Sequence, residues 1–191
     1  MRGIWLLLAL TPLALAAEPV SSTVREQHYL VYGRTIEEIR RSIGERSPVR
    51  NAHSAFGGAT ETHYSASYRL VPVAETQCLL KDAAVKAESV VTLPQLAPGT
   101  LPPAVSAEWR RYYLALRAHE YQHVESARAS ARVAQQWLAG LQLSGPCHAA
   151  RPRVRAAIEA RIRMLDERDR LLDSMTDHGR SQGAELDLRI R

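Results

Sequence analysis

The stretch WRRYYLALRAHEYQHVESARASARVAQQWL, residues 109–138, decides the fold of this chain. Its apolar residues recur at helical spacing on one face, which consists of Trp109, Tyr112, Leu116, Ala127, Ala131, Ala134 and Leu138. The pattern predicts one long helix over about 106–141, stopped by Ser144-Gly145-Pro146. The rest of the fold is therefore expected to pack along this helix.

A pair of histidines four residues apart lies in the middle of the predicted helix, in the motif His119-Glu120-x-x-His123. Residues at this spacing lie one turn apart on the same side, so both imidazoles can reach a Zn²⁺ at about 2.0–2.1 Å. Glu120 projects beside such a metal and can take a proton from a zinc-bound water. The motif is in register with the apolar stripe, so the histidines face the interior. The alternative is a pair of hydrogen-bonded core histidines without a metal.

A third metal ligand must come from farther along the chain, because catalytic zinc sites use three protein ligands and leave one position to water. A third histidine six residues past the motif is absent, since that position is Ala129. Glu125 is turned about 200° around the helix from His123 and points away. The downstream candidates are Glu159, Asp166, Glu167, Asp169, Asp173 and His178.

Before the long helix, the sequence predicts strands and one short helix. A strand over 27–32 ends at Gly33, and Thr35 with Glu38 forms a capping box for a helix that Gly44 can end. After a loop over 47–58, alternating polarity predicts a hairpin of strands 60–73 and 77–93, ended by Pro94 and a linker over 95–103.

After the long helix, a second helix is predicted over 152–174, with Pro152 in its first turn. The turn over 144–151 lets this helix fold back antiparallel to the first. The elements together predict the α+β class: a small antiparallel or mixed sheet packed on a long active-site helix, with a second, C-terminal helix.

The first residues predict export. Met1 and Arg2 precede an apolar run over 4–15 and the small residues of Ala14-Leu15-Ala16, a pattern typical of a Sec-type signal peptide over 1–17. An uncleaved N-terminal anchor is the alternative. The mature chain, 18–191, would be one domain in the periplasm or outside the cell, with no stable membrane insertion. Cys78 and Cys147 are then expected to form one disulfide rather than remain two buried thiols.

The charge pattern argues against a nucleic-acid partner. The formal net charge is +5, but basic residues are interleaved with acidic ones, most clearly over 151–191. A nucleic-acid binder more often concentrates its basic residues in one stripe with aromatics nearby. Four further histidines, His28, His53, His63 and His148, are assigned to surface and loop positions.

An ordered set of motifs carries a family resemblance. The set comprises the first strand and helix (28–43), the Thr-containing strand 60–70, Cys78, Thr92-Leu93-Pro94, Trp109, the His119–His123 motif, Cys147, Thr176-x-His178-Gly179 and Gln182-Gly183-Ala184. With these, the chain resembles a bacterial family of predicted secreted zinc-dependent proteases, a domain of unknown function within the zincin metallopeptidases. Similar proteins often have Tyr-Asp where this chain has Leu172-Asp173.

The resemblance implies a zincin-like fold and His178 as the third zinc ligand. The predicted return of the second helix also brings residue 178 back toward the motif, although a loop-capping histidine is the alternative. Asp173 or Asp177 would then orient a ligand imidazole, and Asp173 is the main rival as ligand.

These observations predict a zinc metallopeptidase, an endopeptidase, with Glu120 as general base and a peptide or protein as substrate. Exposed strand edges offer places for an extended peptide to add as a further strand. Tyr112 and Tyr113, above the motif, are candidate oxyanion donors, although tyrosines at this spacing more often belong to the core. Two other classes stay open: an envelope protein with a structural zinc site, and a helical partner-binding module without metal.

Overall fold

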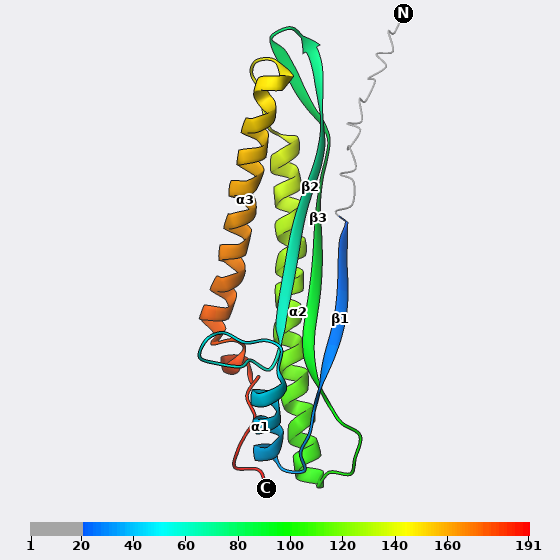
Figure 1. Ribbon diagram of the computed structural model, residues 1–191, viewed down its shortest axis with the longest axis vertical. Helices are drawn as coiled ribbons and strands as arrows, with labels where there is room; N and C mark the ends of the chain where they lie inside the picture. The colour runs from blue at the N-terminus through cyan, green and yellow to red at the C-terminus, as the bar shows by residue number, and fades with distance from the viewer. Residues whose placement is uncertain (1–20) are drawn as a thin grey trace, which may run out of the picture.

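The computed structural model describes residues 21–191, so the predicted signal peptide lies outside the described residues. Figure 1 shows an elongated molecule in which one long helix runs beside a narrow sheet and a second long helix lies antiparallel to it. The elements follow the order β1 (Ser22–Val31), α1 (Ile36–Arg46), β2 (Ala59–Ala74), β3 (Gln77–Leu96), α2 (Pro103–Ala139), α3 (Cys147–Thr176) and a 3₁₀ turn η1 (Arg180–Gln182). The predicted α+β class is confirmed.

The sheet is mixed, with strand order β1-β3-β2. β2 and β3 form the predicted hairpin, with Ala59 opposite Thr92, and β1 adds to β3 in parallel. The prediction that Pro94 ends β3 is wrong, because the strand continues to Leu96. β2 begins opposite Thr92, so at Pro94 the strand is paired on one side only, where a missing N–H is tolerated.

Helix α1 begins as the sequence predicts, with a capping box. Thr35 accepts a hydrogen bond from the Glu38 amide, and the Glu38 carboxylate accepts one from the Thr35 amide. The helix does not end at Gly44, as predicted, but runs through it to Arg46. A helical glycine costs only about 1 kcal/mol, and burial of Ile43 on the preceding position offsets this cost.

Helix α2 spans Pro103–Ala139, close to its predicted bounds, whereas α3 starts five residues earlier than predicted. Pro152 therefore lies inside α3 and not in its first turn. The additional turn is held by complete burial of Ala150 and by the disulfide at Cys147, which together outweigh the one hydrogen bond that the proline removes.

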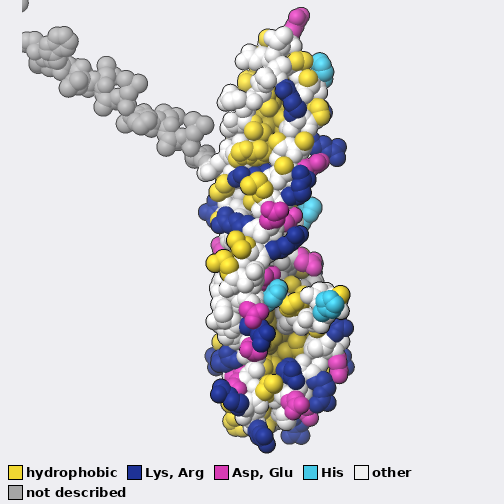
Figure 2. Space-filling view, turned by 90° about the vertical axis from the view of Figure 1, so that its left-hand side faces the viewer, with side chains coloured by type: hydrophobic (Ala, Val, Ile, Leu, Met, Phe, Trp, Pro, Cys, Tyr) yellow, Lys and Arg dark blue, Asp and Glu magenta, His cyan; other side chains and the backbone are white. Residues whose placement is uncertain are grey.

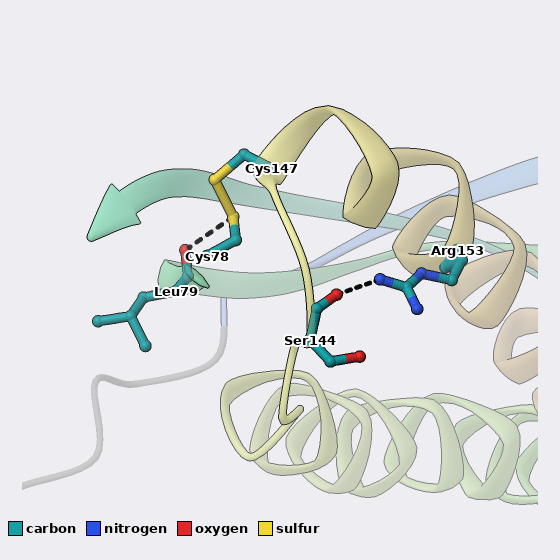
Figure 3. Close-up of a disulfide and its surroundings, with 5 residues drawn as sticks. All are labelled: Cys78, Leu79, Ser144, Cys147 and Arg153. Atoms are coloured by element: carbon teal, nitrogen blue, oxygen red, sulfur yellow. Dashed lines mark hydrogen bonds between the residues drawn. A yellow bond between two sulfur atoms is a disulfide. The ribbon is translucent and has the colours of Figure 1, made fainter. Parts of the chain in front are cut away.

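The predicted disulfide is present. Cys78, near the start of β3, is bonded to Cys147, the first residue of α3, across 69 residues of sequence. Figure 3 shows this bond joining the hairpin to the start of α3. Because such bonds persist in oxidising compartments, the disulfide agrees with a location outside the cytoplasm. Within residues 21–191, none of the helices has the length and apolarity needed to cross a bilayer.

Two apolar clusters fill the space between the sheet and the helices. The first lies around α1 and is built from large side chains, including Ile36, Ile39, Val91, Leu93, Tyr112, Leu116 and Leu186. The second lies between β2, β3, α2 and α3 and is rich in alanine, with Ala87, Ala127, Ala131 and Ala134. The small side chains let the sheet and helices approach closely there, whereas the first cluster surrounds a polar site.

Candidate metal centre

The motif on α2 turns three polar side chains inward. His119, Glu120 and His123 have only 2%, 3% and 3% of their surface exposed. The Nε2 atoms of the two histidines lie 3.3 Å apart, as expected for residues one helical turn apart on the same side. Charged and polar groups are rarely buried this fully without a partner or a metal, so the local arrangement requires an explanation.

Asp173 on α3 completes a group of three converging ligand atoms. Its Oδ1 lies 3.2 Å from the Nε2 atom of His119 and 3.2 Å from that of His123. One ligand atom from each of the three residues lies within 4.8 Å of the others. The group depends on the antiparallel return of α3, which brings a residue 50 positions downstream against the motif.

The other ring nitrogen of each histidine has an acceptor of its own. His123 Nδ1 lies 2.8 Å from Asp169 Oδ1, and His119 Nδ1 lies 3.0 Å from Gln182 Oε1. The Gln182 amide nitrogen in turn donates to Gln122 Oε1 at 3.0 Å, which fixes the Gln182 oxygen toward His119. Both Nδ1 atoms therefore face an acceptor, and both Nε2 atoms face the carboxylate of Asp173. With Nδ1 protonated, both Nε2 atoms would be available to a metal.

The electrostatics of the group favour a cation at its centre. Burial alone lowers the pKa of His123, but hydrogen bonds to Asp169 and Asp173 outweigh burial and raise the pKa to about 10. Burial alone raises the pKa of Asp173, but hydrogen bonds to the two histidines outweigh burial and lower it well below its usual range. Both shifts arise because the protonated imidazole and the carboxylates attract each other, and the same carboxylates would attract a divalent cation. The donor set thus fits Zn²⁺.

Glu120 stands beside this group without belonging to it. The Thr60 hydroxyl on β2 lies 2.9 Å from Glu120 Oε2 and 2.9 Å from its backbone oxygen, so the strand fixes both the side chain and the helical turn. Burial raises the pKa of Glu120, while the Thr60 hydrogen bond and the nearby histidines oppose this shift. A carboxylate with a raised pKa next to a metal site suits a general base.

His178 and Asp177 lie at the edge of the group, where the chain turns after α3. Both have left-handed backbone conformations, with φ of 52° and 49°. His178 Nδ1 is 3.5 Å from Asp173 Oδ1, its side chain is half exposed, and its ring packs on Phe56 with centroids 4.6 Å apart. The group of three converging ligand atoms includes Asp173, which the sequence offered as the alternative third ligand to His178. His178 lies outside this group and contacts Asp173. Asp177 is exposed and pairs with Arg180.

The turn after α3 needs a glycine where it crosses His119. Gly179 has φ of +79°, and a Cβ there would lie 2.8 Å from Cγ of the His119 ring. The Thr176 hydroxyl accepts a hydrogen bond from the Gly179 amide, so the Thr176-x-His178-Gly179 pattern forms a closed turn. This turn delivers Gln182 to His119.

The other carboxylates considered from the sequence are not part of the group of three converging ligand atoms. Glu125 is exposed and pairs with Arg128, as its predicted outward direction requires, and Glu159 pairs with Arg155 on the surface of α3. Asp169 contacts His123 as an acceptor at Nδ1 rather than as a third ligand. Sequence reasoning did not find the roles of Thr60 and Gln182, although Thr60 lies in the Thr-containing strand and Gln182 in the Gln182-Gly183-Ala184 motif of the family resemblance. The spacing of Asp169 and Asp173, one turn apart, was a further signal.

The site opens into a cleft of about 720 Å³. Its walls come from α1, the loop over 49–58 and the segment over 184–188, and its floor includes Tyr112 and the residues of the metal group. Figure 2 shows the hollow on the α3 side of the molecule, with apolar surface inside and histidine and charged side chains around it. The volume is in the range of ligand-binding clefts and leaves the group accessible from outside.

The fold and the site together define an α+β protein with one disulfide and a candidate two-histidine, one-aspartate metal centre. The chain belongs to DUF922, a bacterial family of proteins of unknown function, which matches residues 26–179. Neither a curated protein nor a solved structure matches the chain. The family match confirms the bacterial family of unknown function predicted from the ordered motifs, while its place among the zincin peptidases stays a prediction.

Proposed function

We propose that this protein is a zinc-dependent hydrolase of the periplasm or the extracellular space that cleaves peptide bonds. The observation that carries the proposal is the convergence of three ligand atoms next to a buried carboxylate, at the base of an open cleft. Three protein ligands with an accessible fourth position are typical of catalytic zinc, whereas structural sites are closed by four protein ligands.

Each side chain of the site then has a defined task. His119, His123 and Asp173 hold the ion, which when bound lowers the pKa of a coordinated water and polarises a substrate carbonyl. Thr60 binds Glu120 Oε2, so Oε1 is the oxygen left to accept the proton of the attacking water. Gly58 passes beside Oε1 without a side chain, which keeps that oxygen accessible. Glu120 then returns the proton to the leaving amine.

The decisive experiment replaces Glu120 by Gln. We expect the variant to bind about one zinc, as the wild type does, and to lose hydrolysis of an unstructured protein such as casein by about 10²–10⁴-fold, the usual share of a general base. Glu125→Gln is the matched control, because Glu125 lies on the same helix but is exposed on the opposite side. Equal turnover by the Glu120→Gln variant would show that the assigned role is wrong.

The third ligand is assigned by a second pair of variants. We expect Asp173→Asn to weaken zinc binding far more than His178→Gln does, because only Asp173 reaches both histidine Nε2 atoms. Zinc affinity is measured by competition with a colorimetric chelator. The reverse order of effects would return the ligand position to His178.

A structural zinc clip is the second candidate function, because the group joins α2 to α3. A clip and an enzyme both lose thermal stability on chelation, so melting alone does not separate them. Bound zinc that raises the melting temperature, without any hydrolysis of a broad peptide library by the wild type, would favour the clip.

A further inference from the structure

Most of the charged side chains that line the cleft have a partner of opposite charge within the protein. Arg180 donates to Glu185 at 2.6 Å and lies 3.6 Å from Asp177, so its charge is compensated. The Asp173 carboxylate faces the two histidines of the metal group. Arg40, from α1, also lines the cleft, but within residues 21–191 it has no ion pair, hydrogen bond or ring contact. Its positive charge is therefore not neutralised by any carboxylate of the described chain.

The position of Arg40 on α1 places it beside an apolar part of the cleft wall. Arg40 follows buried Ile39 and precedes Ile43 by three residues, and residues three apart share one side of a helix. Ile43 lines the cleft together with Arg40. Arg41, the next residue, is exposed outside the cleft and has the Glu38 carboxylate as an electrostatic partner. The two adjacent arginines thus differ in both direction and surroundings.

A guanidinium without a partner is suited to a carboxylate. Its planar group of N–H donors matches the two oxygens of a carboxylate, and it stays protonated at physiological pH. A charge in a cleft with apolar walls attracts ions of opposite sign, because such walls screen the charge less than open water does. Ile43 and Leu186, both buried, are parts of this wall. In a peptide, the group that fits is the carboxylate of an acidic side chain or of the C-terminus.

Arg40 and the metal group come from different elements of the fold. The three ligands and Glu120 lie on α2 and α3, whereas Arg40 lies on α1. Arg40 pairs with neither Glu120 nor Asp173, and Glu120 is held by Thr60 instead. The guanidinium therefore remains available to a bound peptide while Glu120 accepts a proton. The same cleft thus contains the place of reaction and a separate charged contact for the substrate.

We infer that Arg40 is a substrate-recognition residue, which binds a carboxylate of the peptide and makes the protein prefer peptides that offer one at this place. The inference rests on the proposed peptidase function and adds a substrate class to it. Arg40 acts in binding and not in the reaction, so its effect belongs to the affinity for the peptide. Because Arg40 is exposed in the free protein, its contribution is that of a partly solvated ion pair.

The test compares Arg40→Gln with Arg41→Gln as matched control, because both replace an exposed arginine of α1 but only Arg40 lines the cleft. Zinc-loaded protein carrying Glu120→Gln selects a peptide from a random library, and fluorescence anisotropy measures its affinity. The peptide is then changed in two ways. Its acidic side chains are replaced by the corresponding amides, or its C-terminal carboxylate is amidated.

We expect at least one of these two changes to weaken binding to the protein with Arg40 by about 2- to 5-fold, the upper part of the range for exposed ion pairs. Arg40→Gln should remove this dependence on the carboxylate, and Arg41→Gln should keep it. An effect of the side-chain amides would identify an acidic residue as the group that Arg40 binds. An effect of amidation at the end of the peptide would identify the C-terminal carboxylate.

Two further measurements separate recognition from a structural role. Arg40→Lys keeps the charge but not the planar donor group, so it should retain only part of the dependence. Raising the salt from about 0.1 to about 1 M shortens the Debye length from about 10 to about 3 Å and should reduce the dependence. Melting of the Arg40→Gln variant should equal that of the parent, because Arg40 has no partner within residues 21–191. Lower melting with equally weakened binding of all peptide versions would show a structural role and overturn the inference.

Failure of the carboxylate contact and failure of the peptidase are separate outcomes. If both peptide changes affect the parent and the Arg40→Gln variant equally, the inference is overturned, even if the wild type hydrolyses the peptide. Absence of any peptide binding to zinc-loaded protein would overturn it too. Arg40-dependent binding without hydrolysis by the wild type would keep the contact and reject the peptidase.

Discussion

The two ends of the molecule are held together by different means. At the disulfide end, which comprises the β2–β3 turn, the later half of α2 and the start of α3, alanines pack the helices on the sheet and Cys78–Cys147 adds a covalent bond. At the metal end, which comprises α1, the His119–His123 turn, the end of α3 and the segment after it, large aliphatic residues surround a buried polar group. Figure 1 places these ends at opposite extremes of the long axis.

The difference shows how a small domain stays folded around a site whose buried polar groups cost free energy. Cys147 and Asp173 lie near opposite ends of α3, 26 residues or about 39 Å apart. The covalent bond fixes the register of α3 at one end, and the contacts of Asp169 and Asp173 with the two histidines fix it at the other. The disulfide end thus acts as a scaffold, while the metal end carries the buried polar residues His119, Glu120 and His123.

Removal of the disulfide is the largest expected change in stability. Replacing both Cys78 and Cys147 by Ser frees a loop with a sequence separation of 69 residues in the unfolded chain, which corresponds to about 4 kcal/mol of unfolding free energy. Urea unfolding followed by circular dichroism measures this loss. If the ends are independent, zinc affinity of the folded variant stays unchanged. A parallel loss of zinc affinity would instead show that the bond positions Asp173 from a distance.

The second expected effect concerns Glu108, whose hydrogen bonds hold the C-terminal segment against α2. This carboxylate is 7% exposed, accepts two hydrogen bonds from Arg111 and one from the Asp187 amide, and Arg111 also donates to the Gly183 carbonyl. These hydrogen bonds hold the segment that carries Gln182. We therefore expect Glu108→Gln to lower the free energy of unfolding by about 1.5–3 kcal/mol, the range for hydrogen bonds to a charged group. Amide hydrogen exchange should rise at the metal end and stay unchanged at the disulfide end.

The same carboxylate predicts a pH dependence. The Arg111 hydrogen bonds hold the pKa of Glu108 below its usual value, although burial opposes them. A lowered folded-state pKa contributes stability above the unfolded pKa of 4.5, and this contribution is lost as the pH falls through the lower folded value. In metal-free protein, acid should therefore open the metal end first. Glu108→Gln should lack this part of the pH dependence, and an unchanged profile would contradict the assignment.

The third prediction concerns Asp169, which contacts His123 in the candidate metal centre. Asp169→Asn keeps the size of the side chain that accepts from His123 Nδ1 but removes its charge, and we expect zinc affinity to fall by about 10- to 100-fold, as for other partners of ligand histidines. Glu167→Gln, nearby on α3, is the control. Melting of the chelated protein should fall as well, because Asp169 pairs with buried His123 in the absence of metal. Zinc affinity equal to that of the wild type would assign Asp169 a purely structural role.

The extent to which the sequence predicted this fold depended on which residues made a local pattern. The capping box of Thr35 and the helical stripe on α2 act within a few residues and were found with nearly correct bounds. Gly44, Pro94 and Pro152 were expected to end or begin elements, but tertiary pairing and burial override such preferences. Local propensity therefore located the elements better than their ends.

For the site, too, the residues in a local pattern were predicted and those that depend on tertiary packing were not. His119, Glu120 and His123 share one helical turn, so their common face followed from spacing alone. The choice between Asp173 and His178 depended on the crossing of α2 and α3 and on two left-handed residues after α3, which the spacing does not encode. Thr60 and Gln182 came from elements far away in the sequence, and their contacts follow only from the packed structure.

The smallest expected effect tests whether α1 is part of the metal end or merely attached to it. Thr35→Ala removes the N-cap of α1 and should cost about 1 kcal/mol, whereas Thr35→Ser, which keeps the hydroxyl, should cost less. Because α1 supplies Arg40 and Ile43 to the cleft, hydrogen exchange should rise in α1 and along the cleft in the Ala variant, with zinc affinity unchanged. Hydrogen exchange that rises equally at the disulfide end would show that the molecule opens as one unit. Loss of the N-cap of α1 would then raise exchange at the far end of α2 about as much as beside the cleft.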